Sequence, residues 1–215
     1  MSVFEQLSRN KGTVSTTLGK TLARDVLDKG QSDLLRECIE LTVHEPSAPA
    51  ARHIRAGAAK VVELVAEKRP DLVAPHLASL LPALSVAEPQ TRWMIIRVMG
   101  YCAKLNHAVA QRAVAYAGKY VDAKEGVCLA AATDLFLGDL GAISKKDAQQ
   151  AFPMLQLAME NPITNEAGWL LEAGFKMYGN LGKTERDHVQ RFAQQCQSSP
   201  QKSTQQRARK ILRLE

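Results

Sequence analysis

Apolar positions recur along most of this chain with the spacing of an α-helix. They return every three or four residues rather than at alternate positions, and the β-branched and aromatic runs typical of strands are absent. A first helix is predicted over residues 17–28 and ends at Gly30. Residues 1–16 are predicted to form a polar N-terminal arm. The fold class predicted by this pattern is all-α.

Turn markers divide the rest of the chain at intervals of about 33 to 40 residues. These markers are Pro49, Pro89, Asp122, Pro162 and Pro200. Between them the pattern predicts five pairs of helical segments: 31–44 with 50–69, 71–84 with 90–105, 107–121 with 125–141, 145–160 with 165–182, and 184–198 with 202–214. Each pair can bury its apolar side only against its neighbours. Residues 17–215 are therefore predicted to be a single α-solenoid domain of about five antiparallel helix pairs, in a right-handed superhelical stack.

The segment 71–105, DLVAPHLASLLPALSVAEPQTRWMIIRVMGYCAKL, has an apolar first helix, a short turn with Pro89, and a second helix that opens with Arg92. It resembles HEAT and armadillo-like repeats, and the resemblance extends over residues 31–214. The third and fourth pairs lack an arginine matching Arg92, and the fifth is short and polar, so an irregular helical bundle is the alternative. The resemblance implies kinked first helices, and Pro153 predicts such a kink, since proline removes a backbone hydrogen bond.

Composition narrows the class of protein further. Hydrophobic residues make up 46% of the 215 residues but aromatic residues only 5%, so Ala, Leu and Val must fill the interior. The net charge of +6 suits an acidic partner, although solubility alone also explains it. Neither a signal peptide nor a membrane-spanning segment is predicted. The four cysteines lie far apart, which predicts free thiols and a cytoplasmic location.

Motifs for catalysis and for metal binding are missing from the sequence. The five histidines fall in separate segments, with no HxxxH or CxxC to bring two ligands together. Two GKT triplets, 19–21 and 182–184, lack the earlier glycine of a phosphate-binding loop, because Val14 and Met177 stand there. No nucleophile and base can be paired from helical repeats alone. The sequence therefore favours a non-catalytic protein and predicts no cofactor and no metal.

The second helices carry the candidate binding residues. At 100° per residue, segment 92–105 gathers five apolar residues on one side: Ile95, Val98, Met99, Cys102 and Leu105. The opposite side holds Trp93, Arg97, Tyr101 and Lys104. In a HEAT-like solenoid the second helices line the concave surface, so this aromatic and basic stripe is predicted to face a partner.

The later pairs repeat this arrangement. In 165–182 the apolar arc leaves Trp169 and Lys176 on the opposite side. In 125–141 the apolar arc consists of Leu129, Ala132, Phe136 and Leu140, and Asp134 is predicted to face outward. The predicted groove contains Trp93, Arg97, Tyr101, Lys104, Asp134, Trp169 and Lys176. The alternative is that each tryptophan packs against a neighbouring repeat.

Two functions fit this groove. The first is a scaffold whose concave face holds a protein or peptide, with aromatic and arginine side chains as anchors. The second is nucleic-acid binding. Two groove tryptophans, the string Gly168-Trp169-Leu170-Leu171 and a basic last helix are similar to the alkylpurine DNA glycosylase family of helical-repeat proteins.

That second resemblance implies aromatic contacts to a damaged nucleotide and an aspartate one helical turn after the first tryptophan. Arg97 stands at that position here, and Asp134 lies one repeat later on the same predicted face. Base excision is therefore not expected. Binding to the DNA backbone stays open, because lysine and arginine neutralise phosphates and aromatic rings stack on bases.

Overall fold

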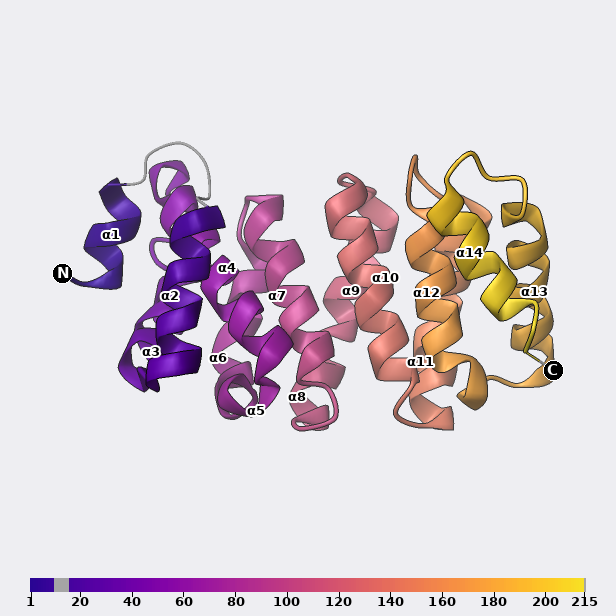
Figure 1. Ribbon diagram of the computed structural model, residues 1–215, viewed down its shortest axis with the longest axis horizontal. Coiled ribbons are helices and arrows are strands. Elements are labelled where there is room, and N and C mark those ends of the chain that lie inside the picture. Colours follow the sequence, from indigo (N-terminus) through magenta and orange to yellow (C-terminus); the bar gives the residue numbers. More distant parts are fainter. Residues whose placement is uncertain (10–15, 215) are drawn as a thin grey trace. The chain divides into compact units, whose positions relative to one another are not determined.

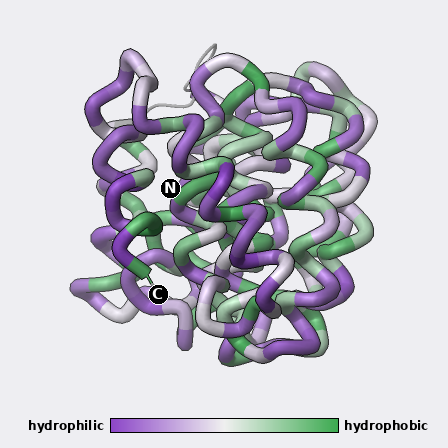
Figure 2. The backbone as a smooth tube through the Cα atoms, turned by 90° about the vertical axis from the view of Figure 1, so that its right-hand side faces the viewer, coloured by the Kyte–Doolittle hydropathy of each residue, from purple (hydrophilic) through white to green (hydrophobic). Residues whose placement is uncertain are grey.

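The computed structural model describes residues 1–9 and 16–214, and every regular element in these ranges is an α-helix or a 3-10 turn (Figure 1). The all-α prediction is confirmed. The chain divides into two compact units, Met1–Ala113 (unit 1) and Val114–Glu215 (unit 2), where the sequence predicts one domain. Hydrophobic and hydrophilic stretches alternate along the helices (Figure 2), as expected for helices that bury one side and expose another.

Unit 1 consists of helices joined by short turns. Its elements are α1 (Val3–Arg9), α2 (Thr16–Lys29), α3 (Ser32–Leu41), η1 (Pro49–Ala51), α4 (Arg52–Lys68), α5 (Pro70–Val73), η2 (Ala74–His76), α6 (Leu77–Leu80), η3 (Leu81–Ser85), α7 (Pro89–Tyr101) and α8 (His107–Arg112). Helix α4 is central, because it packs against α1, α2, α3 and α7. It buries Val61, Val62 and Val65 completely.

The first helix predicted for the second pair, 71–84, is a series of short α and 3-10 turns. Pro75 and Pro82 explain the breaks, since a proline inside a helix removes one hydrogen bond and clashes with the preceding turn. By contrast, α11 (Lys145–Glu160) in unit 2 continues through Pro153 without interruption.

Unit 2 also consists of antiparallel helix pairs. Its remaining elements are α9 (Val114–Ala123), α10 (Val127–Gly141), α12 (Ala167–Met177), η4 (Tyr178–Asn180), α13 (Lys183–Cys196) and α14 (Lys202–Ile211). Helix α10 packs against α9, α11 and α12, and α12 packs against α13 and α14 as well. The helix predicted over 107–121 is two helices, α8 and α9, which are separated at Ala113, the last residue of unit 1.

Local chemistry explains several helix ends. Pro89 occupies the first turn of α7, where its missing N–H costs nothing. Ser144 caps α11 by accepting a hydrogen bond from the Asp147 backbone N–H at 3.2 Å. Gly126 has a φ of 96° in the turn before α10, a conformation that other residues rarely adopt.

Close helix packing fixes the position of one glycine in unit 2. A Cβ atom on Gly138 of α10 would lie 2.6 Å from the Ala173 Cα of α12, closer than real Cβ contacts allow. The two helices therefore approach each other backbone to backbone at this point. Larger side chains on either side, including Leu129 and Phe136, complete a core from which solvent is excluded.

The predicted polar arm contains a helix. Val3 and Leu7 of α1 are 3% and 2% exposed, and α1 packs against α3 and α4. The spacing of these two residues, one helical turn, was too short a pattern to predict a helix. In the parts of the chain that the structure describes, no helix combines the length and apolar character needed to cross a bilayer.

Candidate partner-binding surface

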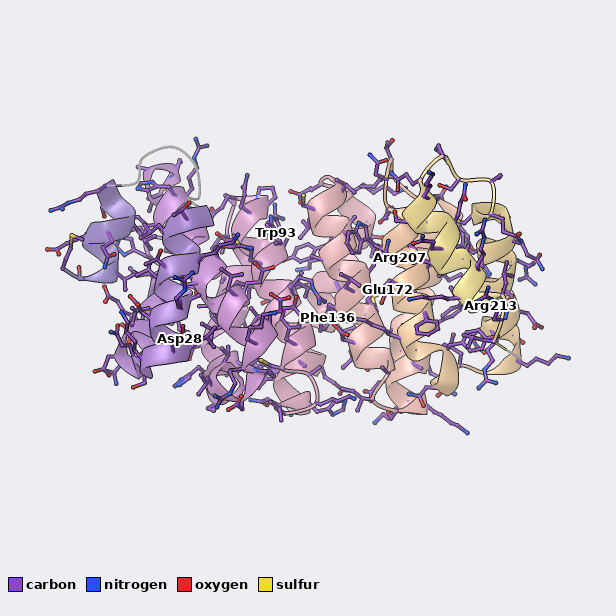
Figure 3. The ribbon with its side chains drawn as sticks, viewed as in Figure 1. Asp28, Trp93, Phe136, Glu172, Arg207 and Arg213 are labelled. Atoms are coloured by element: carbon purple, nitrogen blue, oxygen red, sulfur yellow. The ribbon has the colours of Figure 1, made fainter. Side chains whose placement is uncertain are left out.

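The indole ring of Trp93 lies half-buried on α7 in unit 1 (Figure 3). The Lys60 ammonium on α4 lies 5.6 Å from the ring centroid, within the range of a cation–π interaction. The same ammonium is 2.7 Å from Glu63 Oε2. Trp93 is thus covered in part by the neighbouring helix of its own unit and open in part to solvent.

Arg97 does not face outward as the sequence predicts. It is 7% exposed, and its guanidinium carbon lies 4.3 Å from the ring centroid of half-buried Tyr101, one turn further along α7. The prediction was wrong because a helical wheel assumes a single buried side. Helix α7 packs against α4, η3 and α8, so most of its circumference is covered.

The end of α7 also differs from the prediction. The helix ends at Tyr101, and Leu105, which was assigned to the core, is 57% exposed. Lys104 is exposed, as expected, but in the turn that follows the helix. Helical spacing has no meaning beyond the last helical residue. The structure therefore brings Trp93, Arg97 and Tyr101 together on one helix, with Lys104 beyond its end.

A cavity of about 650 Å³ opens in unit 1 between the N-terminal ends of α4 and α7. Ser47, Arg52, His53 and Gln90 contribute to its rim, and Arg55 and Glu88 to its floor. Sequence analysis missed this cavity. Its two walls are 33 residues apart in the chain, and neither wall carries a motif.

A buried ion pair forms the floor of the cavity. Arg55, only 1% exposed, donates from Nε to Glu88 Oε1 at 2.8 Å and from Nη2 to Glu88 Oε2 at 2.7 Å. Its Nη1 donates to the backbone carbonyls of His44, Glu45 and Ala48. Thr91 Oγ1 donates to Glu88 Oε1 at 2.6 Å. The floor is thus a rigid, fully hydrogen-bonded base that joins the 44–48 turn to α4 and α7.

The electrostatics of Glu88 follow from these contacts. Burial raises the pKa of Glu88, but the hydrogen bonds from Arg55 and Thr91 outweigh burial and leave the pKa below its usual value. Glu88 is therefore ionised at neutral pH and balanced by Arg55. The guanidinium of Arg52 on the cavity rim is exposed and forms no ion pair among the described residues, and it lies beside the half-buried His53.

In unit 2, Trp169 is covered in the same manner as Trp93. The Arg207 guanidinium carbon on α14 lies 4.9 Å from the ring centroid of Trp169 on α12. Arg207 Nε also donates to Glu172 Oε2 at 3.2 Å, and the two side chains lie next to each other between α12 and α14 (Figure 3). A Cβ on Gly168 would lie 3.2 Å from Arg207 Nη1, so the glycine leaves room for the arginine.

Lys176 has a partner inside unit 2. Its ammonium lies 2.6 Å from Asp139 Oδ1 on α10, and both side chains are half-buried. The two helices α10 and α12 are thus bridged at their C-terminal ends. The pairing lowers the charge that Lys176 offers to a partner. Helical spacing could not predict it, because the two residues lie 37 apart in the chain.

Asp134 is placed opposite to its predicted position. The sequence predicts an outward side chain, yet Asp134 is 0% exposed. The predicted apolar arc of α10 is confirmed, since Leu129, Ala132, Phe136 and Leu140 are all buried. The error lies in the other side of the helix, which packs against neighbouring helices instead of facing solvent. Asp134 and Arg97 are therefore not exposed as predicted, and the joining of Trp93, Tyr101, Lys104, Trp169 and Lys176 into one groove stays a prediction.

Comparison with known proteins identifies the fold. No protein-family model matches the sequence, and no curated protein matches it. Among solved structures, the chain is similar to the designed armadillo repeat protein YIII(Dq)4CqI, with a TM-score of 0.65 over 97% of this chain and 98% of that one, at 11% identity. The chain therefore has an armadillo-like helical-repeat fold. The resemblance to alkylpurine DNA glycosylases gains no support.

Proposed function

We propose that this protein is a non-catalytic binding module that holds a protein or peptide segment against the second helices of unit 1. The observation that carries the proposal is the cavity of about 650 Å³ at the N-terminal ends of α4 and α7. Its volume is in the range of sites that bury a small ligand or a few side chains. Armadillo-like repeats commonly bind partners, and solenoids use extended concave surfaces for this purpose, which favours a surface of this kind.

Helical spacing extends this surface from the cavity to Trp93. On α7, Gln90 of the rim lies one turn before Trp93, and on α4, His53 of the rim lies two turns before Lys60. The Trp93–Lys60 contact therefore follows the cavity along both helices. A partner segment can place one side chain in the cavity and lay the next against the indole, the kind of aromatic anchor that dominates binding energies.

The charge of the rim favours an acidic partner segment. The floor is neutral as a pair, so Arg52 gives the cavity a positive edge. A carboxylate beside an apolar anchor residue would complement both features. Base excision is disfavoured on separate grounds, because Arg97 stands where a carboxylate is needed and Asp134 is sealed from solvent.

The test is a random peptide library displayed on phage and panned against the whole protein. Enriched peptides, synthesised with a fluorophore, should bind the protein with an affinity that falls at least about tenfold in Trp93→Ala and in Arg52→Glu, as measured by fluorescence polarisation. Arg36→Glu makes the same charge change at an exposed position of α3 outside the cavity, and it should alter affinity less than about twofold.

Three outcomes would contradict the proposal. The first is a peptide affinity that is equal in wild type and Arg52→Glu. The second is Trp93→Ala that costs about 3 to 5 kcal/mol of stability and leaves binding intact, since that is the signature of a packing residue. The third is duplex DNA that binds with an affinity falling steeply with salt while no peptide is enriched, which would favour nucleic acid.

A further inference from the structure

A pocket of about 380 Å³ opens in unit 2 between α11 and α13, the first helices of two successive pairs. Its volume lies in the range of sites that take a small ligand. The residues that line it are Gln149, Phe152, Pro153 and Gln156 of α11, and Thr184, Glu185, His188 and Arg191 of α13. None of them belongs to the cavity of unit 1, so the pocket is a second, separate site.

The middle of the pocket is apolar and uncharged. Phe152 is 3% exposed, and its ring meets the edge of the His188 ring with a centroid distance of 6.0 Å and an angle of 84°. Burial, and then the charge of Arg191, lowers the pKa of His188, so the imidazole is neutral at pH 7. Together with the exposed ring of Pro153, these groups suit an apolar side chain.

The pocket carries opposite charges at positions well separated along α13. Glu185 and Arg191 are six residues apart, which is about 9 Å along the helix axis. Neither forms an ion pair in the parts of the chain that the structure describes. Glu160, whose charge also reaches His188, accepts a hydrogen bond from Gln156 at 2.9 Å and does not line the pocket. One carboxylate and one guanidinium are therefore available to a ligand.

Pro153 adds a backbone acceptor to the wall of the pocket. It lies inside α11 but has no N–H, so the Gln149 carbonyl lacks the hydrogen bond that the residue four positions later normally donates. Gln149 and Pro153 both line the pocket. A carbonyl oxygen in this position can accept a hydrogen bond from an N–H group of a ligand.

We infer that this pocket binds a free peptide of two or three residues, with its ammonium at Glu185 and its carboxylate at Arg191. An extended peptide of this length spans about 7 to 10 Å, which matches the separation along α13. Arginine binds carboxylates through two parallel hydrogen bonds. The peptide N–H groups suit the Gln149 carbonyl, and an apolar side chain packs on the middle of the pocket. A segment inside a longer chain lacks both terminal charges and fits less well.

The experiment is a calorimetric titration of the whole protein at pH 7 with the tripeptide Ala-Leu-Ala in three forms: with free ends, N-acetylated and C-amidated. The free form should bind once per chain, and each blocked form should bind at least about tenfold more weakly. Arg191→Gln should bind the free and the amidated forms equally. Glu185→Gln should bind the free and the acetylated forms equally. Loss of this discrimination assigns each end of the peptide to one residue, which a purely structural role would not do.

The matched controls are Lys183→Gln and Asp187→Asn, because they remove the same charges at exposed positions of α13 outside the pocket. Both should keep the affinities of the wild type. Thermal unfolding followed by circular dichroism checks that every variant is folded.

Three results overturn the inference. The first is no binding of the free tripeptide up to about 10 mM. The second is equal affinity for the free and blocked forms. The third is a preference for the free carboxylate that persists in Arg191→Gln. The result is independent of the proposed surface in unit 1, since peptides displayed on phage have no free carboxyl end and the variants that test that surface lie in other helices.

Discussion

Glu88 of unit 1 and Asp134 of unit 2 are both buried carboxylates on or beside a second helix, yet their surroundings are opposite. Glu88 accepts hydrogen bonds from Arg55 and Thr91, whereas Asp134 accepts none. The pKa of Glu88 is lowered and the pKa of Asp134 is raised. A buried acid in this fold is therefore either an ionised part of the framework or a group that keeps its proton to higher pH, and hydrogen-bond partners distinguish the two cases.

The largest expected loss of stability comes from breaking the pair that Glu88 forms with Arg55. Arg55→Met leaves Glu88 buried without its counter-ion, and it should destabilise unit 1 by about 3 to 5 kcal/mol in urea unfolding followed by circular dichroism. Arg55→Met combined with Glu88→Gln buries no charge and should lose clearly less than the single variant. A single variant that loses under about 1 kcal/mol would remove the distinction between the two acids.

Substitution of the unpaired acid, Asp134, should change the stability in the opposite direction. At pH 7, Asp134→Asn should stabilise unit 2 by about 1 to 3 kcal/mol, because a neutral amide costs less to bury than a carboxylate. The raised pKa means that the folded state holds its proton after the unfolded state has released it near pH 4. The stability of the wild type should therefore fall as the pH rises above about 4.

Urea unfolding at pH values from 4 to 8 measures this slope. Asp134→Asn should flatten it, and the remaining slope belongs in part to Glu166, whose pKa is also raised by burial. Asp139→Asn, on the same helix, should keep the slope of the wild type. A stability gap between wild type and Asp134→Asn that is the same at every pH would show that the pKa of Asp134 is the same in the folded and unfolded states, which would contradict the raised pKa.

The smallest expected losses of stability come from removing the cations that lie over the two indole rings. Lys60→Ala in unit 1 and Arg207→Ala in unit 2 should each cost about 0.5 to 1 kcal/mol, because these cations remain partly solvated. Tryptophan emission during urea unfolding reports both, in chains with the other tryptophan replaced by phenylalanine. Equal losses would show that the units differ in their acids and not in their aromatic contacts. A loss above about 2 kcal/mol would mean that the cation holds its helices together.

Most of the helical framework was predictable because its ends depend on local chemistry. Proline and glycine at the turns determine where helices stop, and apolar spacing determines which side is buried, as the four arc residues of α10 demonstrate. Pro75 and Pro82 were visible in the sequence, but whether a proline breaks a helix depends on the packing around it, since α11 continues through Pro153.

The candidate site was less predictable because it depends on contacts between distant residues. The helical wheel predicted that Arg97 and Asp134 face outward, because a wheel considers one helix alone and not the second or third helix that packs against it. The Arg55–Glu88 floor and the Lys176–Asp139 bridge join residues 33 and 37 apart, and a lone arginine or aspartate in a helix gives no sign of such a partner. Trp93 and Trp169 were identified because each lies opposite the apolar side of a second helix, and both are partly exposed in the structure.

The helix break at Ala113 also has a consequence for the order in which the protein is made. Unit 1 takes its core from residues that precede the break, so its interior can close while the ribosome is still adding the residues of unit 2. At about 5 to 20 residues per second, the roughly one hundred residues of unit 2 leave an interval of about 5 to 20 seconds. During that interval the nascent chain already carries the Arg55–Glu88 floor, so the cavity can be complete before unit 2 has been added.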